Sequence, residues 1–576
     1  MSKSSGLRLV FLFCAALAAP SAFMLRAAEP TAEDDVVSLP RLMVEEKARP
    51  LQWRYLELPG LEILSVCDDS TAMNLLRRYH RLEELLSVIL PDRFCAKSAV
   101  PEAHILFNEE TGRARSPEVI GEMLKKEGVS TGPDGVIRGA GNESAPFGRA
   151  QRVRFLPNMR LWDTDATAVF SILQEGSASL RAFTFAPDRI AFLTERRTPV
   201  LPDWFAEGEL GLYLRTKLGE DDLEIDTAEW LSEDERTALS RDPEHPRTLL
   251  PMQELLTRPR PKTSDDGELD RVWRAQCVLF VRWAVTEQKG AHREALWKFV
   301  DRLEAEPPTE ALFRECFGMS FADARDALSD YLPVAVRTKV TLDGPKATSL
   351  PRVKFRAATD LEVARIRGRW ERMEIAYVRK RYPALADRYI EQTRRTLHRV
   401  YDRGERDPQL LAELGLTEID AGNPDGGREF LEAAVLANAP RPRAYFELAR
   451  LRFQAVPGSA EPTTKLTVAE TQRILAPLLA SRLIEPPLSD AYALMGEIWA
   501  RSVVPPTNAE LAILNEGARL FPTVPVVMLR TIYCNAANGR PAKALALIDT
   551  AVRLTRDPAM RKRFENLRDE LPALKP

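Results

Sequence analysis

The stretch that decides the C-terminal fold is DPQLLAELGLTEIDAGNPDGGREFLEAAVLANAP, residues 407–440. It predicts two helices separated by a turn at Gly422, because apolar residues recur at helical spacing on both sides of that glycine. The next match to Gly415 is Ala449, 34 residues further on. The stretch from 524 to 558 repeats the pattern of its second half, with matching spacing at these positions: Gly422, Gly427, Leu431 and Ala434, then Gly539, Ala544, Ile548 and Ala551.

A helix-turn-helix unit that recurs every 34 residues, with small residues where the helices cross, resembles the tetratricopeptide (TPR) repeat. The resemblance implies an all-α TPR superhelix over residues 407–576, ending in a capping helix at 561–571. Such a solenoid has a concave groove, so the binding site is expected in the TPR groove between 407 and 576, with a protein or peptide as partner.

The part before the repeats predicts an α+β architecture, because strand patterns come first and helical patterns follow. WRYLELPGLEILSVCDD predicts two strands with a turn at Pro59-Gly60. We expect an α/β subdomain over 51–154, a helical subdomain over 155–335 and a helical connector over 336–406. TAVFSILQEGSASLRAF, residues 167–183, is predicted as a helix of the second of these parts.

One helix of this region carries an acidic residue on an apolar face. In LPDWFAEGELGLY, residues 201–213, an N-cap at Asp203 puts Glu207 on the same face as Leu210, Gly211 and Leu214. A buried carboxylate needs a partner. An arginine such as Arg181 or Arg282, or a water-filled cavity, would supply one; alternatively Glu207 is half-exposed at the start of the helix, where the helix dipole favours a negative charge.

The segment WFAEG (204–208), the helix RVWRAQCVLFVRWAV (271–285) and the pair of helices in 311–332 resemble the peptidase MA-like, or gluzincin, metallopeptidases. In that family two histidines of an HExxH helix and a downstream glutamate bind Zn²⁺, and the glutamate of HExxH is the general base. The resemblance implies an α+β gluzincin-like domain in front of the repeats.

The residues aligned with HExxH depart from that pattern. They read Gln174-Glu175-Gly176-Ser177-Ala178, so that both histidines are replaced. Glu175 keeps the general-base position and Glu207 the third-ligand position, but an amide and an alanine are not zinc ligands. We therefore expect vestigial metal positions at Gln174, Ala178 and Glu207, a vestigial base at Glu175, and no bound metal, cofactor or catalytic residue.

Composition and charge describe a globular protein without a general affinity for nucleic acid, since the net charge is −3 over 576 residues. The N-terminus has a short basic region and the apolar run 9–19, which predicts a signal peptide over 1–28 and a disordered linker over 29–50. The mature protein is then expected to be exported, periplasmic or secreted from a bacterium, without an integral membrane segment. Its oligomeric state is left open.

A local basic excess lies between Arg352 and Arg403, with fifteen Lys/Arg against seven Asp/Glu. It predicts two long helices that join the domains, with solvated faces on which residues such as Glu371 and Glu374 pair with nearby arginines. An anionic partner is the alternative reading of the same charges.

These features favour an exported, catalytically inactive metallopeptidase-like protein that acts as a TPR binding or scaffold protein. Two alternatives remain at this stage. The chain could be an active zinc metallopeptidase whose ligands lie elsewhere, or the repeats could carry the function while the front domain serves as a structural cap.

Overall fold

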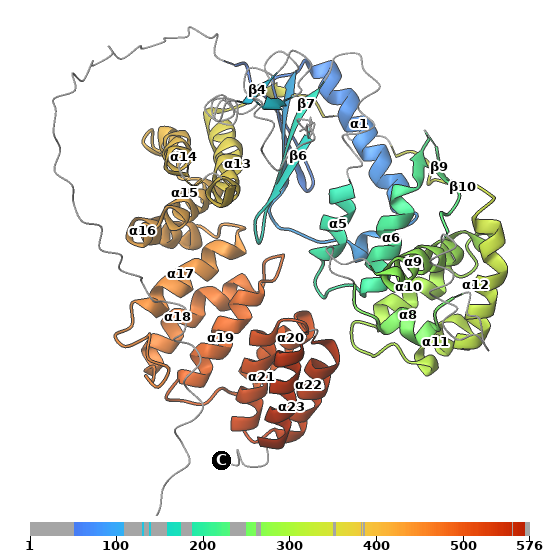
Figure 1. Ribbon diagram of the computed structural model, residues 1–576. Coiled ribbons are helices and arrows are strands. Elements are labelled where there is room, and N and C mark those ends of the chain that lie inside the picture. Colours follow the sequence, from blue (N-terminus) through green and yellow to red (C-terminus); the bar gives the residue numbers. More distant parts are fainter. Residues whose placement is uncertain are drawn as a thin grey trace, which may run out of the picture.

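A computed structural model describes residues 51–108, 129–131, 137–139, 158–173, 187–219, 221–230, 249–260, 267–348, 353–381, 383, 386–555 and 557–570. The predicted signal peptide and linker, residues 1–50, lie outside these ranges, as do Gln174, Glu175 and Ala178 of the HExxH-like stretch. An N-terminal α+β region is followed by a long run of packed helices (Figure 1).

The N-terminal region is built on a mixed six-stranded sheet in the order β11-β1-β2-β3-β7-β6. β2, β3 and β7 run parallel, while β1 and β6 are antiparallel to their neighbours. The predicted turn at Pro59-Gly60 joins β1 to β2, and Gly60 has the positive φ of 76° that a glycine tolerates. The strands span these residues: β1 Arg54–Leu58, β2 Leu61–Ser65, β3 Glu102–Asn108, β6 Asn158–Trp162, β7 Thr167–Leu173 and β11 Arg356–Ala357.

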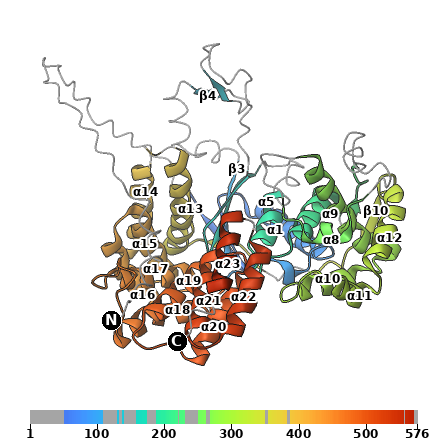
Figure 2. The ribbon, with the colours of Figure 1, turned by 60° about the horizontal axis from the view of Figure 1, so that its bottom comes forward.

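Helices cover both faces of this sheet. α1 (Asp69–Leu86) follows β2 and packs its apolar stripe, which includes Leu75 and Leu76, against one face. α13 (Asp360–Arg381) packs Ile366 and Trp370 against the other face. Figures 1 and 2 show the sheet between these two helices from different directions. Thus α13, which begins the predicted connector, is part of the core of the N-terminal sheet.

A second core lies among the helices that follow β7. Its largest buried side chains are aromatic and include Trp204, Trp273, Phe280 and Trp283. A small antiparallel sheet in the order β10-β9-β8 lies at its edge. The elements span these residues: α5 Pro187–Glu195, α6 Asp203–Leu214, β8 Thr216–Leu218, β9 Asp222–Ile225, α8 Met252–Thr257, α9 Glu268–Thr286, α10 Arg293–Arg302, α11 Glu310–Phe317, α12 Phe321–Ala335 and β10 Val340–Asp343.

The C-terminal part is a run of consecutive packed helices, compatible with helical repeats, which we call the helical region. α13, α15, α17, α19 and α21 each contact the next of the series, and the helices between them pack on one side. The predicted 34-residue units and the terminal helix at 561–571 fall on helix pairs and on α23. The elements after α13 are α14 Ala386–Tyr401, α15 Pro408–Ala421, α16 Pro424–Leu436, α17 Pro442–Gln454, α18 Val468–Ser481, α19 Ser489–Arg501, α20 Asn508–Leu520, α21 Pro525–Ala537, α22 Pro541–Leu554 and α23 Pro558–Glu570.

Helix packing continues across the predicted start of the repeats at residue 407. Leu410 and Leu414 of α15 pack with Leu397 and Val400 of α14. The basic stretch forms two helices, as predicted, but they make the first pair of the helical region as well as the link to the sheet. Within the described ranges, no helix is both long enough and apolar enough to cross a membrane.

The predicted helix over 167–183 is wrong in its first part, because Thr167–Leu173 is strand β7. β7 lies between β3 and β6, and most of its side chains are buried. A strand covered on both faces has a continuous apolar sequence, which cannot be told from a buried helix by its periodicity.

Candidate functional site

The glutamate at the third-ligand position is buried, as the sequence suggested, but on a different helix face. Glu207 is 9% exposed, whereas Leu214 of the predicted apolar face is 58% exposed. α6 begins at Asp203, one residue earlier than an N-cap there would allow, with Pro202 as its N-cap. The face that packs on α9 contains Trp204 and Gly208 together with Gly211 of the predicted face.

Gly208 explains how closely α6 approaches α9. A Cβ atom at this position would lie 2.4 Å from Cγ2 of Val281 and 2.8 Å from the carbonyl oxygen of Cys277. Both distances are shorter than a van der Waals contact, so only glycine fits. The glycine of WFAEG is therefore explained by helix packing.

The partner of Glu207 is a pair of arginines. Oε2 of Glu207 lies 2.8 Å from Nε of Arg260, and Oε1 lies 3.9 Å from Nε of Arg274. An arginine partner was expected, but Arg282 is not that residue. Arg282 lies two turns further along α9 and donates to the carbonyl oxygen of Thr338 and to Tyr331. Arg181 lies outside the described residues.

Among the residues that the structure describes, the surroundings of Glu207 do not form a zinc site. α5, the helix that packs against α6 from the N-terminal side, has the sequence PDRIAFLTE and contains no histidine. Two guanidinium groups beside the carboxylate oppose the approach of a cation. No group of three potential metal ligands occurs among the residues that the structure describes.

A second buried glutamate of α6 was not anticipated. Glu209 is 1% exposed, and neither of its carboxylate oxygens has a hydrogen-bond partner among the residues that the structure describes. Burial raises the pKa of Glu209 well above its ordinary value, so the neutral acid is the favoured form. Nothing in the sequence distinguishes it from an exposed helical glutamate.

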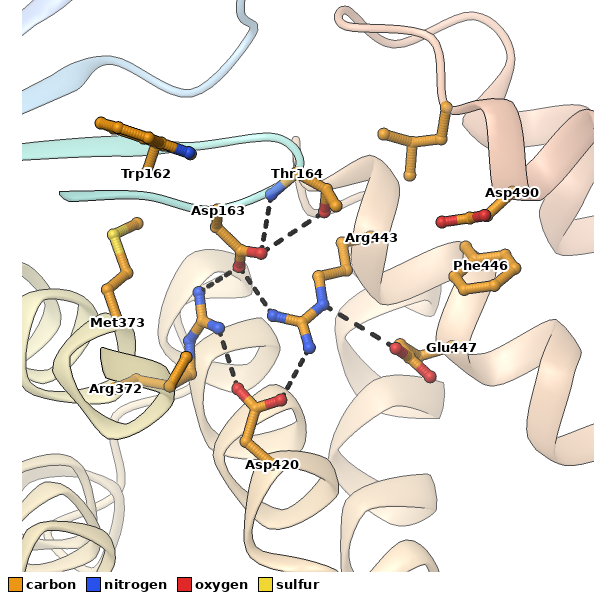
Figure 3. A pocket seen from close by; sticks show the side chains of 12 residues that line it. Trp162, Asp163, Thr164, Arg372, Met373, Asp420, Arg443, Phe446, Glu447 and Asp490 are labelled. Carbon is orange, nitrogen blue, oxygen red and sulfur yellow. Dashed lines mark hydrogen bonds and ion pairs between the residues drawn. The ribbon is translucent and has the colours of Figure 1, made fainter. Parts of the chain in front are cut away.

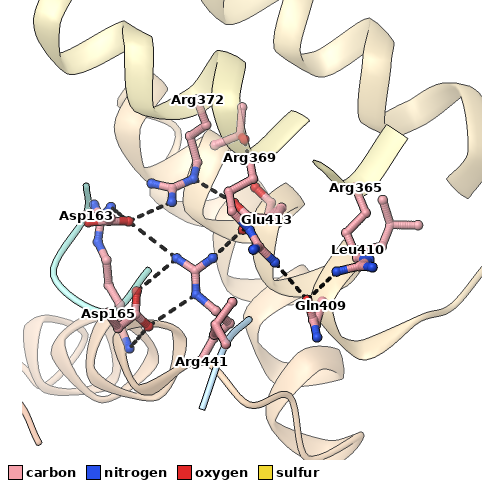
Figure 4. Close-up of polar contacts among 12 residues, drawn as sticks. Asp163, Asp165, Arg365, Arg369, Arg372, Gln409, Leu410, Glu413 and Arg441 are labelled. Atoms are coloured by element: carbon pink, nitrogen blue, oxygen red, sulfur yellow. Dashed lines mark hydrogen bonds and ion pairs between the residues drawn. The ribbon is translucent and has the colours of Figure 1, made fainter. Parts of the chain in front are cut away.

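The largest concentration of buried charge lies where the N-terminal region meets the helical region. The turn between β6 and β7, which carries Asp163 and Asp165, reaches α13, α15 and α17 (Figures 1 and 4). We call this turn, Asp163–Ala166, the hairpin tip. Five carboxylates and five guanidinium groups form one connected set: Glu62, Asp163, Asp165, Glu413 and Asp420 with Arg365, Arg369, Arg372, Arg441 and Arg443.

Arg441 lies at the centre of this set and is fully buried. Its Nη2 donates to Oδ1 of Asp165 at 2.9 Å and its Nε donates to Oδ2 of the same residue at 3.2 Å, which is a bidentate contact. Nη1 donates to Glu413. Asp165 also accepts a hydrogen bond from the backbone N–H of Arg443 at 2.8 Å. The guanidinium therefore joins the hairpin tip to α15 and α17.

The surrounding charges keep the buried carboxylates ionised. Burial by itself would raise the pKa of Glu413, but three neighbouring guanidinium groups, led by that of Arg441, lower it to about 2. Burial also opposes ionisation of Asp163, and the guanidinium groups of Arg372 and Arg443 outweigh it, so its pKa falls well below the ordinary value. An equal number of opposite charges makes this degree of burial tolerable.

The sequence contained a signal for this cluster that the charge count concealed. Arg365, Arg369 and Arg372 stand at i, i+4 and i+7 on α13, so they share one helix face. The expectation of solvated faces is wrong for these three, which are buried, but Arg367 does pair with Glu371 at 2.9 Å. Their carboxylate partners lie 40 to 200 or more residues away in the sequence.

A cavity of about 330 Å³ opens beside the hairpin tip (Figure 3). Its walls come from the N-terminal region and from α13, α15, α17 and α19. The lining includes Trp162, Thr164, Met373, Phe446, Glu447 and Asp490. It lies on the predicted groove side of the helical region, at the end of the buried charges.

No protein-family model matches this chain, and neither a curated protein nor a solved structure is significantly similar to it. The likeness to gluzincin peptidases therefore rests on the short motifs around Glu207 and in 311–332. The likeness to TPR proteins rests on the 34-residue period and on the packed helix pairs.

Proposed function

We propose that this protein binds a protein or peptide partner on the inner side of a TPR-like helical region, and that its metallopeptidase-like region is catalytically inactive. We further propose that the chain is exported, on the basis of its basic and apolar N-terminal sequence. Each part has its own support and its own test.

The observation that carries the binding function is the seating of the hairpin tip. α13 and the start of α17 hold a polypeptide turn through Arg372, Arg441 and Arg443, with side-chain and backbone hydrogen bonds, and α15 pairs with these arginines through carboxylates. The intervening helices α14 and α16 contribute no residue to this contact set. The inner side is thus chemically suited to hold a polypeptide, and it extends beyond the hairpin along α17, α19 and α21.

The inactivity of the N-terminal region is supported by the environment of Glu207. Its carboxylate forms ion pairs with Arg260 and Arg274, so it is already engaged by cations of the chain itself. The sequence also replaces both histidines of the HExxH pattern with Gln174 and Ala178. Without imidazole ligands, one carboxylate does not hold zinc at trace concentrations.

The zinc content of the purified, undialysed protein tests the inactive assignment. We expect well under one zinc per chain and no cleavage of casein. Glu207→Ala should lower the stability modestly and leave the metal content unchanged. Near-stoichiometric zinc that disappears in Glu207→Ala, together with proteolysis, would establish an active peptidase instead.

Binding is tested by selecting random dodecapeptides displayed on phage against the full-length protein. Reproducible enrichment of a sequence pattern is expected, and its synthetic peptide should bind in fluorescence anisotropy. If no pattern is enriched, the peptide-binding function is not supported. Export is tested by N-terminal sequencing of the mature chain, which should begin downstream of the apolar run 9–19.

A further inference from the structure

The hairpin tip divides two neighbouring cavities that both regions of the chain help to build. The first is the cavity of about 330 Å³ described above, and the second has a volume of about 300 Å³. Asp163, Thr164, Leu488 and Asp490 line both. Because these residues come from the tip and from the start of α19, the two cavities form one composite cleft across the junction of the regions.

Some charged side chains of the first cavity form ion pairs and others do not. Arg372 and Arg443, its two cations, are both engaged by Asp163 and Asp420. Asp490 is exposed and makes no ion pair with any residue that the structure describes.

Glu447 adds a second carboxylate on the same side as Asp490. It pairs with Arg450 at 2.6 Å and also lies 3.8 Å from Nε of Arg443. The cavity as a whole has four carboxylates against two guanidinium groups. Three of these carboxylates have guanidinium partners, so the charge that stays unpaired among the described residues is that of Asp490.

Two aromatic side chains line the first cavity. Trp162, at the end of β6, is 48% exposed although it is among the largest apolar side chains. The ring of Phe446 on α17 lies next to Asp490 in Figure 3. An aromatic face beside a carboxylate suits the side chain of lysine or arginine, because the ring holds the apolar stem or the cation and the carboxylate holds the charge.

The second cavity offers mainly apolar contacts. Val200, 42% exposed, faces it from the segment before α6. The opposite wall is formed by the segments before α19 and α21, with Pro486, Pro487, Leu520, Phe521 and Val524. An apolar side chain would bury its surface against this wall, beside the charged side chains of Lys97, Glu195 and Arg196 that also line the cavity.

We propose that this composite cleft binds a peptide segment of a partner protein in which a basic residue lies close to an apolar one. The basic side chain occupies the first cavity, which Asp490 and Trp162 both line, and the apolar side chain occupies the second. This inference rests on the proposed binding function and adds to it the chemistry of the partner and the requirement for both regions of the chain.

The peptides enriched by phage display on the full-length protein provide the probe. Lysine or arginine should be enriched next to leucine, isoleucine, valine or phenylalanine. Asp490→Lys, on the helical region, and Trp162→Ala, on the N-terminal region, should each weaken binding of the enriched peptide by about tenfold, the size expected for a hot-spot contact. Circular dichroism should show both variants folded, since both side chains are substantially exposed.

Asp425→Lys is the matched control. Asp425 also lies in the first turn of a helix, α16, but on the outer side and with its side chain 92% exposed. It should leave the affinity unchanged. Enriched peptides without basic residues, or equal affinities for wild type, Asp490→Lys and Trp162→Ala, would overturn the composite cleft while leaving peptide binding in place. Absence of any enriched peptide would overturn both.

Discussion

Replacement of Arg441 by methionine tests whether the buried charges fix the hairpin tip to the helical region. Methionine keeps much of the apolar stem and removes the guanidinium group. Removing one partner from a buried ion pair typically costs about 3–5 kcal/mol, because the other charge stays buried without compensation. The contacts that remain show where this cost arises.

Asp165 should lose more of its hydrogen bonds in Arg441→Met than Glu413 does. Glu413 keeps hydrogen bonds from Arg369 at 3.2 Å and Arg372 at 2.8 Å. Asp165 keeps only the backbone N–H of Arg443 among its described donors, at 2.8 Å. Neutralising Asp165 should therefore relieve the single variant. We expect Arg441→Met with Asp165→Asn to be about 1–3 kcal/mol more stable than Arg441→Met alone, which is the usual size of such coupling.

The assay is urea unfolding of the full-length protein, followed by circular dichroism and tryptophan fluorescence. Arg395→Met is the control, because Arg395 pairs with Glu391 at 3.2 Å in a position where the two side chains are 76% and 51% exposed. That change should cost at most about 0.5 kcal/mol. If the double variant is no more stable than Arg441→Met, or if the control loses as much as Arg441→Met, the buried set does not act as a coupled unit.

Three further changes follow from the same structure. Burial raises the pKa of Glu209, so this group stabilises the fold below the ordinary carboxyl pKa and loses that contribution as the pH rises. Glu209→Gln should therefore raise the melting temperature more at pH 8 than at pH 4. An equal effect at the two pH values would refute the protonation of Glu209. The pKa of Glu413 is lowered to about 2, so this carboxylate stabilises the fold above the unfolded pKa near 4.5 and ceases to do so as the pH falls toward 2. The melting temperature of Glu413→Gln should therefore fall less steeply than that of wild type between pH 5 and pH 3. An equally steep fall would contradict this. Gly208→Ala should destabilise by about 1–3 kcal/mol despite the better helix propensity of alanine, since its Cβ meets Val281 and the backbone of Cys277; an increase in melting temperature would show that α6 can move away from α9.

The helical region could be predicted from the sequence because its contacts are local. Each helix packs mainly on its neighbours in the chain, so a period of 34 residues in small and apolar positions is a direct record of the packing. The strands β1 and β2 were likewise visible through the turn at Pro59-Gly60. β7 was not, since a strand buried on both faces lacks the alternation that identifies an exposed one.

The environment of Glu207 shows how far a motif can lead. The sequence offered a buried carboxylate with an arginine or a water-filled cavity as partner, or a half-exposed carboxylate at the helix start, and the structure has the buried carboxylate with arginine partners. It could not identify Arg260 and Arg274, because the first follows α8 and the second is on α9, and their distance from α6 depends on the glycine contact at Gly208. The predicted face holds for Gly211, which packs on α9, and fails for Leu214, which is exposed at the end of α6.

A count of charged residues does not reveal the buried charges at the hairpin tip. Fifteen basic residues between 352 and 403 suggest a solvated surface until their carboxylate partners are known, and those partners come from strands and helices far apart in the sequence. Once Asp163 and Asp165 are seated against Arg441 and Arg443, the first part of the inner side of the helical region is occupied by the chain itself. The partner proposed above would then use the composite cleft beyond the tip, which Trp162 and Asp490 line from the two regions of the chain. Recognition at the composite cleft would depend on how the N-terminal region and the helical region are placed relative to each other. The Arg441 variants perturb that placement.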